Sequence, residues 1–379
     1  MSYLEKLLNG AEVEWKKLGE VADYEQPTKY LVKSSNYNDN FSIPVLTAGK
    51  TFILGYTDET EGIYKASENP VIIFDDFTTA NKWVDFDFKA KSSAMKMITS
   101  KDESVALIKY IYYWLNTVPS GLVEGDHKRQ WIGNYSNKKI PIPPLSVQKE
   151  IVRILDTFTE LTAELTAELE ARKKQYEYYR EQLLMVNDKL LMNGVKAEWK
   201  TLGEVLVRTK GTKITAGQMK ELHKENAPLK IFAGGKTIAF FDYDDIPQKD
   251  INREPSIIVK SRGIIEFEYY DKPFSHKNEM WSYHSKDEDI NIKFVYYFLK
   301  INEPHFQNIA GRMQMPQISI PDTDKFKIPV PSLAEQERIV GILDQFDTLV
   351  NSISEGLPKE IALRQQQYEY YRNELLNFE

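Results

Sequence analysis

The sequence predicts an α/β (α+β) protein in which two mixed α/β domains, in a pseudo-twofold arrangement, are joined by two long antiparallel coiled-coil helices. Three observations carry this prediction. The segment 13–21 recurs at 197–205, and the segment 139–145 recurs at 327–333. Both copies then lead into a long helical segment that contains Gln-Tyr-Glu-Tyr-Tyr-Arg, at 175–180 and at 367–372. The frame is therefore duplicated, while the stretches that it encloses differ.

The length and the composition of the chain limit the number of domains and the classes of protein to which it can belong. A chain of 379 residues has room for two or three domains, each with its own core. The absence of cysteine excludes disulfides and thiolate metal sites, and five scattered histidines disfavour a structural zinc site. The N-terminus lacks the basic and apolar regions of a signal peptide, and no apolar run approaches the ~20 residues of a membrane helix. We expect a soluble, cytoplasmic protein without a metal or cofactor of its own.

The net charge of −7 argues mildly against nucleic acid as a partner, because phosphate contacts need clustered lysine and arginine. Six of the seven excess negative charges, however, lie in the helical segments 151–194 and 336–379. The rest of the chain is nearly neutral, so a local basic face is compatible with the composition.

The alignment of the two copies predicts that the chain ends meet. The offset between copies is 184 residues at Trp15, 188 at Ile140 and 192 at Tyr176, so the second copy is longer late in its globular part and again within its helix. Leu-Leu-Asn-Gly at 7–10 aligns with Leu-Met-Asn-Gly at 191–194, which follows the first long helix. The N-terminus thus carries the tail of a unit whose helix lies at the other end of the chain, which indicates a cyclic arrangement.

Each globular region is predicted to combine buried strands with a packed helix. The β-branched runs 70–74 and 256–259 indicate strands, and the aromatic-rich segments 105–115 and 292–299 indicate helices. Their tyrosines and phenylalanines fit a protein core better than a surface for base stacking.

The first long helix is predicted over 148–191, about 66 Å at ~1.5 Å per residue. Its seam positions alternate in spacings of four and three, which is a heptad pattern; they are Ile151, Leu155, Phe158, Thr162, Leu165, Leu169, Arg172, Tyr176, Tyr179 and Leu183. The second seam runs from Ile339 through Ile353 and Leu357 to Leu375, with two successive spacings of four around Leu357. Gly356 and Pro358 stand there, so a kink or break is expected. Antiparallel pairing would cover both apolar stripes.

The tetrad Thr-Ala-Glu-Leu occurs twice in succession, at 162–165 and 166–169. One added tetrad lengthens a continuous helix by ~6 Å and rotates the rest of the helix by ~40°. B-DNA rises ~3.4 Å per base pair and turns once per ~10 to 10.5 pairs, so a tetrad is commensurate with one or two base pairs. Taken alone, ordinary coiled-coil repetition with good helix formers is the simpler interpretation.

The ordered set of repeated motifs resembles the specificity (S) subunit of type I restriction-modification enzymes. The set comprises two Trp-Lys-x-Leu-Gly-Glu-Val segments, two Ile-Pro-x-Pro-x-Leu-x-x-Gln segments that end at Gln148 and Gln336, and the paired Gln-Tyr-Glu-Tyr-Tyr-Arg helices. The resemblance spans the whole chain. The tetrad also resembles the central repeat whose copy number, in some members of that family, goes with the length of the nonspecific spacer in the DNA target.

The resemblance implies four segments: target-recognition domain 1 at 1–145, a central conserved helix at 146–193, target-recognition domain 2 at 194–333 and a C-terminal conserved helix at 334–379. Each domain would read one half of an asymmetric bipartite site in double-stranded DNA. The implied partners are two methyltransferase (M) subunits, which use S-adenosylmethionine, and two motor-nuclease (R) subunits, which use ATP and magnesium. The helix faces outside the seam would then dock the M subunits, and no membrane is involved.

No catalytic motif is complete in this chain. Gly-Lys-Thr occurs within 46–51 and 232–237, but a P-loop needs a glycine where Pro44 and Lys230 stand, so we predict structural turns. The Asn/Asp-Pro-Pro-aromatic signature that the family resemblance associates with adenine methyltransferases is absent. Asp75 and Asp76 lack the nearby lysine of a nuclease site, and a metal role for them is a minor alternative. We predict that the chain is not an enzyme.

Bases are read chiefly by Arg, Lys, Asn and Gln, while phosphate contacts set the position of the protein. The strongest candidates lie in polar, glycine-flanked segments at equivalent positions, for which a solvated turn is the alternative: Lys128, Arg129 and Gln130, with Arg312 and Gln314. Secondary candidates, for which a hydrated surface is the simpler interpretation, are Lys82, Lys89, Lys91, Ser92, Lys260, Ser261, Arg262, His276 and Lys277.

Two rival functions are compatible with parts of this pattern. A coiled-coil scaffold without DNA contact explains the helices and the acidic charge, but not why two similar frames enclose such different sequences. An enzyme with an unfamiliar site is disfavoured by the incomplete motifs.

Overall fold

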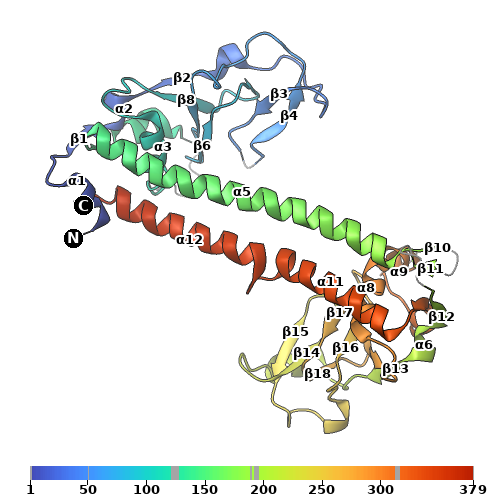
Figure 1. Cartoon of the computed structure of the whole chain (residues 1–379). Coiled ribbons are helices and arrows are strands. Elements are labelled where there is room, and N and C mark those ends of the chain that lie inside the picture. The colour runs from blue at the N-terminus through green and yellow to red at the C-terminus, as the bar shows by residue number, and fades with distance from the viewer. Residues whose placement is uncertain are drawn as a thin grey trace. The chain divides into compact units, whose positions relative to one another are not determined.

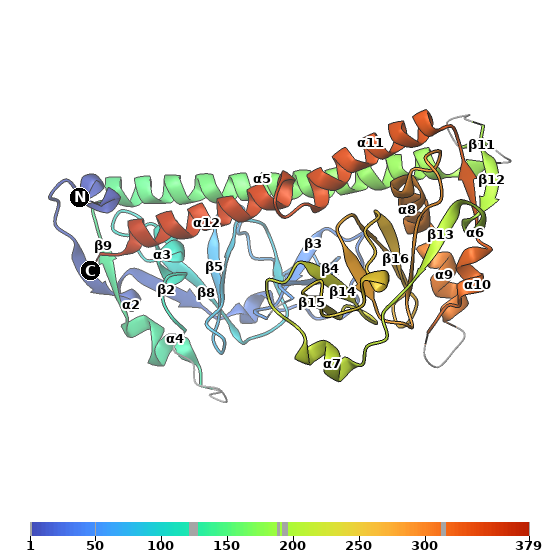
Figure 2. The ribbon, with the colours of Figure 1, turned by 90° about the horizontal axis from the view of Figure 1, so that it is seen from below.

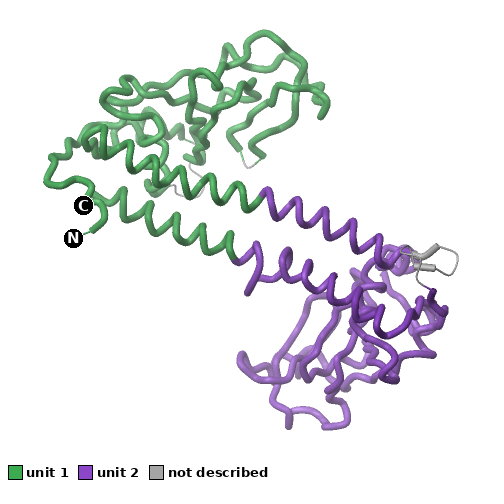
Figure 3. The backbone as a smooth tube through the Cα atoms, viewed as in Figure 1, with its two compact units in different colours: residues 1–166, 360–379 green, residues 167–359 purple. Residues whose placement is uncertain are grey.

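The structure is a computed structural model that describes residues 2–49, 51–120, 128–187, 190–191, 196–311 and 316–378. The chain forms two compact units (Figure 3). Unit 1 consists of residues 1–166 and 360–379, and unit 2 of residues 167–359. Each unit joins one globular region to parts of the long helices, so the units cut across the four segments predicted from the sequence, whose boundaries stay a prediction.

The globular region of unit 1 combines two small sheets with a packed helix. The antiparallel sheet has the strand order β2-β8-β5-β6, and the smaller sheet has the order β4-β3-β7 with β3 and β7 parallel (Figure 1). The strands are β2 (Ala22–Glu25), β3 (Ile43–Leu46), β4 (Ile53–Thr57), β5 (Val71–Asp75), β6 (Asn81–Val84), β7 (Lys89–Ala90) and β8 (Met95–Ser100). β5 is buried along its whole length, and α3 (Ile108–Leu115) buries Tyr110, Tyr113 and Trp114. Both predicted elements are confirmed, with the aromatic residues in the core.

Unit 2 repeats this topology strand for strand. Its sheets have the orders β13-β19-β16-β17 and β15-β14-β18, with β14 and β18 parallel. The elements are β13 (Leu206–Lys210), β14 (Leu229–Phe232), β15 (Ile238–Phe241), β16 (Ser256–Lys260), β17 (Glu266–Tyr270), β18 (Phe274–His276), β19 (Trp281–Ser285) and α8 (Ile292–Ile301). The two copies therefore share one fold although most of their sequence differs.

The remaining elements outside the long helices and the frame are short. They are α1 (Tyr3–Leu8), α4 (Gln130–Gly133), α7 (Ala216–Glu221), α9 (Glu303–Ala310), α10 (Ile320–Asp324), the 3-10 helices η1 (Pro27–Tyr30), η2 (Tyr135–Asn137) and η3 (Gln248–Asp250), and the strands β10 (Val186–Asn187) and β11 (Leu190–Leu191).

The repeated motifs form a frame with the same contacts in both units. β1 (Glu14–Lys17) pairs antiparallel with β9 (Lys139–Ile142), and β12 (Glu198–Thr201) pairs with β20 (Lys327–Val330); the short helices α2 (Leu18–Val21) and α6 (Leu202–Val205) follow β1 and β12. Buried Gln148 accepts the N–H of Leu107 at 3.0 Å and donates to the carbonyl of Val105 at 2.9 Å. Gln336 makes the equivalent bonds in unit 2. These amides tie each long helix to the start of α3 or α8, which is a physical reason for glutamine at the end of both motifs.

The long helices pack along the predicted seam. α5 runs from Leu145 to Leu184, about 60 Å at ~1.5 Å per residue, and stops short of the predicted residue 191 because the chain enters β10. In unit 1, Phe158 of α5 stacks on Tyr371 of α12 (Gly356–Leu376), with ring centroids 5.2 Å apart. In unit 2, Tyr176 of α5 stacks on Phe346 of α11 (Leu333–Asn351), at 6.0 Å. The seam positions of α5 are buried or half-buried except Tyr179.

The predicted break near Gly356 is confirmed. α11 ends at Asn351 and α12 begins at Gly356, whose φ is +74°. A Cβ atom at this residue would lie 2.4 Å from the carbonyl oxygen of Thr348, so only glycine fits without a shift of the backbone. The predicted seam position of Ile353 is wrong, because this residue lies in the connection and is 86% exposed.

The two chain ends meet in unit 1, as the sequence predicts (Figures 1 and 2). Leu4 of α1 is 4% exposed and belongs to the same apolar cluster as Leu375 and Leu376 near the C-terminus. Unit 1 is thus closed by residues from both ends of the chain.

Circular permutation tests this closure. A chain in which residue 379 is joined to residue 1 by a short linker, and which is opened between residues 187 and 188, is expected to fold, because the duplicated frame has its natural opening at the equivalent place. Its melting temperature, measured by circular dichroism, should lie within about 4 °C of the parent, the shift that ~1 kcal/mol produces in a unit of this size. A permutant opened inside β5 is the matched control and should not fold. Failure of both permutants alike would contradict the cyclic arrangement.

Candidate nucleic-acid interface

The candidate segment of unit 1 presents two basic side chains directly before α4. Lys128 and Arg129 are exposed. Gln130 is only 6% exposed, and its side chain donates to the carbonyl of Lys128 and accepts from the amide of Asn134, both at 3.0 Å. The expectation of a DNA contact by Gln130 is therefore corrected: this amide is used within the protein, where it shapes the segment that presents its two basic neighbours.

A buried carboxylate fixes this segment from beneath. Asp76 accepts the N–H of Trp131 on its Oδ1 atom and the N–H of Gln130 on its main-chain oxygen, both at 2.8 Å. Its Oδ2 atom lies 3.4 Å from Nζ of Lys96, and the two side chains are 1% and 0% exposed. Lys96 also lies over the ring of Tyr24, 5.0 Å from its centroid. The orientation of α4, and of the residues just before it, therefore depends on a buried ion pair.

The four secondary candidates of unit 1 divide by exposure. Lys82 and Lys91 are exposed, and Ser92 is half-buried. Lys89 is 1% exposed and its Nζ lies 3.0 Å from a carboxylate oxygen of Glu59. The expectation for Lys89 is corrected, because its charge is already paired inside the unit.

Asp75 shapes a turn. Its Oδ1 atom accepts the N–H groups of Phe77 and Thr78 at 2.9 and 3.2 Å, which closes the turn between β5 and β6. Within the described ranges, no group of three or more His, Cys, Asp or Glu side chains is arranged to hold a metal ion. Among the described residues, therefore, no third ligand of this kind joins Asp75 and Asp76 to form a metal site.

The two segments that contain Gly-Lys-Thr, 46–51 and 232–237, each connect two antiparallel strands, as expected for structural turns. The first connects β3 to β4, where the N–H of Thr47 donates to the carbonyl of Phe52 at 2.8 Å. The second connects β14 to β15, where the N–H of Ala233 donates to the carbonyl of Thr237 at 3.0 Å. A P-loop leads from a strand into a helix, whereas both of these segments lead into a second strand.

In unit 2 the candidates Arg312 and Gln314 lie outside the described residues. Arg262 is exposed in the loop after β16. Its neighbour Gly263 donates its N–H to the carbonyl of Pro316 at 2.9 Å, so this loop is attached to the chain that follows Gln314 in sequence. The loop after β16 and the described chain from Pro316 onwards thus adjoin, although they lie far apart in the sequence.

Ser261 and His276 are buried, and this corrects the expectation for both. Ser261 is 3% exposed and donates to the carbonyl of Glu279 at 3.3 Å. His276 is 0% exposed, with Nε2 3.3 Å from the hydroxyl of Ser282. Burial lowers the pKa of the His276 imidazole, so the ring is neutral at neutral pH and supplies no positive charge to a phosphate.

Lys260 is half-buried between two carboxylates. Its Nζ lies 2.9 Å from Glu268 and 3.5 Å from Glu266 on the neighbouring strand. Burial by itself lowers the pKa of Lys260, but the two carboxylates outweigh that effect and raise it. The ammonium group is charged but engaged within unit 2.

A groove of about 530 Å³ in unit 2 brings basic side chains together from three segments. Lys220 comes from α7, Arg262 from the loop after β16, and Lys277 from the residue after β18; Gly234 of the hairpin turn also lines it. Lys277 is paired with Glu279 at 2.7 Å. Figure 2 shows α7 and α11 on opposite sides of the strands of unit 2. Sequence reasoning missed Lys220, because no motif marks it and only the folded chain places it beside Arg262.

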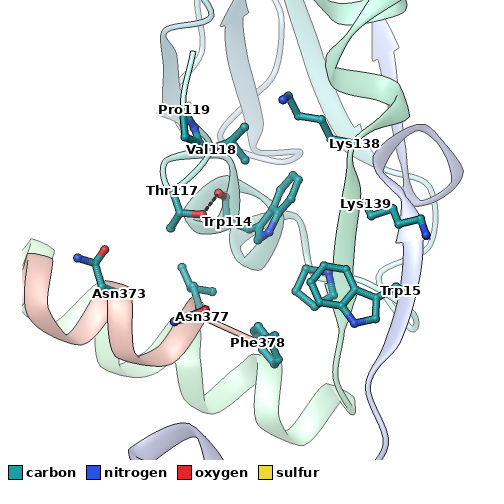
Figure 4. Close-up of a pocket in the computed structure, with 12 residues that line it drawn as sticks. Trp15, Trp114, Thr117, Val118, Pro119, Lys138, Lys139, Asn373, Asn377 and Phe378 are labelled. Atoms are coloured by element: carbon teal, nitrogen blue, oxygen red, sulfur yellow. Dashed lines mark hydrogen bonds between the residues drawn. The ribbon is translucent and has the colours of Figure 1, made fainter. Parts of the chain in front are cut away.

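The frame carries a second kind of site, which is present in both units. In unit 1 a pocket of about 570 Å³ is lined by Trp15 and Trp114, with Asn373 of α12 on its other side (Figure 4). In unit 2 a pocket of about 670 Å³ is lined by Trp199 and Phe298. In the sequence, Trp15 and Trp199 are recognisable only as part of the repeated motif, because the motif does not show whether their side chains are exposed.

No described helix combines the length and the apolar character that crossing a membrane requires.

Known proteins similar to this chain were found by sequence and by structure. The chain matches the family described as type I restriction modification DNA specificity domain twice, over residues 11–172 and 196–363. The EcoR124I/EcoR124II specificity subunit of Escherichia coli is 52% identical over 403 residues, which cover 100% of this chain and 97% of that protein. A putative type I restriction enzyme specificity subunit of Haemophilus influenzae is 34% identical, with 100% and 98% covered. The crystal structure of a type I S subunit from M. genitalium shares the fold, with a TM-score of 0.70, 17% identity and 98% of both chains covered.

The two matched segments coincide with the two copies of the frame, and the similarity to the relatives extends over the whole chain. The mixed α/β regions that the frames enclose are therefore DNA-specificity domains. The chain belongs to the specificity subunits of type I restriction-modification systems.

Proposed function

We propose that this chain reads an asymmetric, split site in double-stranded DNA, with one half-site contacted by the globular region of each unit. The observation that carries the proposal is the contrast between frame and loops. The two regions share their strand order, yet the segments that present basic side chains differ: Lys128 and Arg129 precede α4 in one, whereas Arg262 and Lys220 line a groove in the other. Two regions that share a strand order but present different basic segments are suited to contact two half-sites of different sequence.

The proposed contacts are narrower than the sequence suggested. Arg129 and Arg262 are the proposed base readers, because each is exposed on a segment whose backbone is held by hydrogen bonds, and arginine binds guanine edges through two bonds. The proposed phosphate contacts are Lys82, Lys91, Lys128 and Lys220, with Ser92 next to Lys91. Arg312 and Gln314 stay predictions from the sequence. Lys260 and Lys277 are weaker candidates because their charges are paired within unit 2.

We further propose that α5 sets the spacing of the two half-sites and that the chain itself catalyses nothing. In this proposal two M subunits, which hold S-adenosylmethionine, and two R subunits, which hold ATP and magnesium, assemble on it. The exposed and charged faces of α5, α11 and α12 are the proposed M-docking surface. The printed names of the relatives, specificity subunits of type I restriction enzymes, support such an assembly.

Single substitutions test the assignment of half-sites. In the chain combined with its M partner, Arg262→Gln is expected to relax base preference at one half-site only, by ~5- to 150-fold, the range for loss of one bidentate base contact. Arg129→Gln is expected to relax the other half-site only. The measurement is the map of methylated adenines in a genome that expresses each variant. Arg312→Ala, chosen from the sequence alone, is expected to weaken DNA binding by the assembled methyltransferase and to reduce its salt dependence.

Lys224→Gln is the matched control for these substitutions. Lys224 lies on unit 2 outside the groove and is paired with Asp242 at 2.6 Å, so its removal should change neither half-site. A continuous methylated motif would contradict the split-site proposal, and equal relaxation of both half-sites by Arg262→Gln would contradict the assignment of one half-site to each unit. An electrophoretic mobility shift that is equal for target DNA and for random DNA would favour the rival function, a coiled-coil scaffold without specific DNA contact.

A further inference from the structure

The two pockets of the frame correspond residue by residue. At an offset of 184 residues, Trp15 corresponds to Trp199 and Trp114 to Phe298, and each pair lines its own pocket. At the helical offset of 192 residues, Leu184 corresponds to Leu376, and these residues also line the two pockets. The same depression has therefore been kept at the same place in both units, while the DNA-specificity loops have diverged.

Each pocket combines a rigid exposed tryptophan with an apolar floor. Trp15 is 45% exposed and lies opposite Pro141 in the pairing of β1 with β9; Trp199 is 41% exposed and lies opposite Pro329. The leucine that lines each pocket, Leu376 in unit 1 and Leu184 in unit 2, is buried. A half-exposed tryptophan on a paired strand loses little conformational freedom on binding, which is why this residue type dominates the energetics of protein interfaces.

The charged side chains at the rims are basic in unit 1 and of both signs in unit 2. Lys138 and Lys139 line the pocket of unit 1 (Figure 4). The pocket of unit 2 is lined by Arg180 and Lys300 and also by Glu181 and Glu303, and Lys300 is paired with Glu303 at 2.7 Å. Asparagine side chains also line both pockets and offer donors and acceptors to a peptide backbone. Both pockets therefore complement an apolar side chain with a polar backbone beside it, and the rim of unit 1 also complements a carboxylate.

The duplication limits what the occupant is. The two half-sites of an asymmetric target differ, so equivalent pockets do not distinguish them, whereas a partner that binds in two identical copies needs two equivalent surfaces. One wall of each pocket is helical: Asn373 and Leu376 belong to α12, and Glu181 and Leu184 belong to α5. The pockets are thus continuous with the helix faces on which M docking is proposed.

We propose that each pocket receives an apolar anchor from one copy of the methyltransferase subunit, so that two copies bind through equivalent tryptophans. The proposal rests on the proposed function, because it requires M subunits to bind this chain. It adds a defined anchor site outside the coiled-coil seam, with Trp15 and Trp199 as its central residues and Lys138 and Lys139 as the basic rim in unit 1.

The test is the stoichiometry of complexes between the full chain and purified M subunit, measured by sedimentation velocity. The wild-type chain is expected to bind two M subunits. Trp15→Ala and Trp199→Ala are each expected to weaken one of the two sites by about 30-fold, as for a hot-spot tryptophan, and the double variant to weaken both. Trp15→Phe should restore most of the affinity, and Lys138→Glu with Lys139→Glu should weaken only the site of unit 1.

Ile353→Ala is the matched control, since Ile353 is 86% exposed and lines neither pocket. Equal melting temperatures of all variants would exclude unfolding as the cause of weaker binding. Two M subunits bound at wild-type affinity by the double tryptophan variant would overturn the inference while leaving the proposed function intact. Changed self-association of that variant without M would also overturn it, because the occupant would then be a second copy of this chain. A wild-type chain that binds no M subunit would instead overturn the proposed function.

Discussion

Replacing Lys96 with methionine is expected to lower the free energy of unfolding of unit 1 by about 3–5 kcal/mol, the usual effect of removing one partner of a buried ion pair. Lys96 is inaccessible, and Nζ lies 3.4 Å from the carboxylate of Asp76, which is equally buried. The substitution leaves that carboxylate in the core without a counter-charge. Denaturant unfolding followed by circular dichroism measures the loss of stability. In the proposed function, a loss of base preference at the half-site assigned to unit 1 should accompany it.

Unit 2 indicates why a second substitution should recover stability. The register of the central strands places Lys96 at the position of buried Trp281 and Asp76 at that of buried Ser261, so the fold accepts uncharged residues at both places. Asp76→Asn removes the charge and keeps the oxygen that accepts the N–H of Trp131. Lys96→Met combined with Asp76→Asn is therefore expected to be more stable than either single variant.

The exposed ion pair of Lys65 and Asp87, 2.6 Å apart in the same unit, provides the matched control. Lys65→Met should leave the unfolding curve almost unchanged, because exposed pairs contribute little. A Lys96→Met variant that unfolds at the same denaturant concentration as the parent would show that the buried pair is not needed for stability.

Deleting the tetrad Thr162–Leu165 is expected to abolish methylation at the native split site. The deletion shortens α5 by ~6 Å and turns the rest of the helix by ~40°. In the proposed function both half-sites are contacted at once, so a shift of this size removes one set of contacts and with it about 10³-fold or more in affinity, the usual margin of specific over non-specific binding. Methylation should reappear at the same half-sites with a spacer that is one or two base pairs shorter.

The helix itself should survive this deletion. The second tetrad comes at once, so Leu169 moves into the place of Leu165 and the half-buried seam keeps its leucine. Substituting the four residues by others of equal helix propensity, at constant length, is the control and should leave the spacing unchanged. An unchanged spacer after the deletion would contradict the role of α5 in setting the distance, while leaving the assignment of half-sites untouched.

Much of the frame could be predicted from the sequence because its signals are local. The seam of α5 is evident from regular spacing, and the break at Gly356 from a residue type that suits a positive φ. The meeting of the chain ends is indicated by a displaced copy of four residues. These conclusions needed only the comparison of one half of the chain with the other.

The candidate interface was predicted less well because exposure depends on distant partners. Gln130 looks like a contact residue in a polar segment, yet it is drawn inward beside Asp76, which holds the neighbouring Trp131 from 55 residues away in the chain. His276 is polar in sequence but lies at the end of a short parallel strand in the core. Lys220 gains its significance only from the fold, which places it beside Arg262.

The way in which unit 1 is closed also determines the order in which the protein is completed during synthesis. Unit 2 is one uninterrupted segment that ends at residue 359, whereas unit 1 needs the last twenty residues, 360–379. The first region to leave the ribosome is therefore the last to be finished. Until α12 arrives, the stripe of Ile151, Leu155 and Phe158 lacks the helix that covers it in unit 1. A chain cut after residue 359 would thus lose the helix that completes unit 1 and would keep all of unit 2.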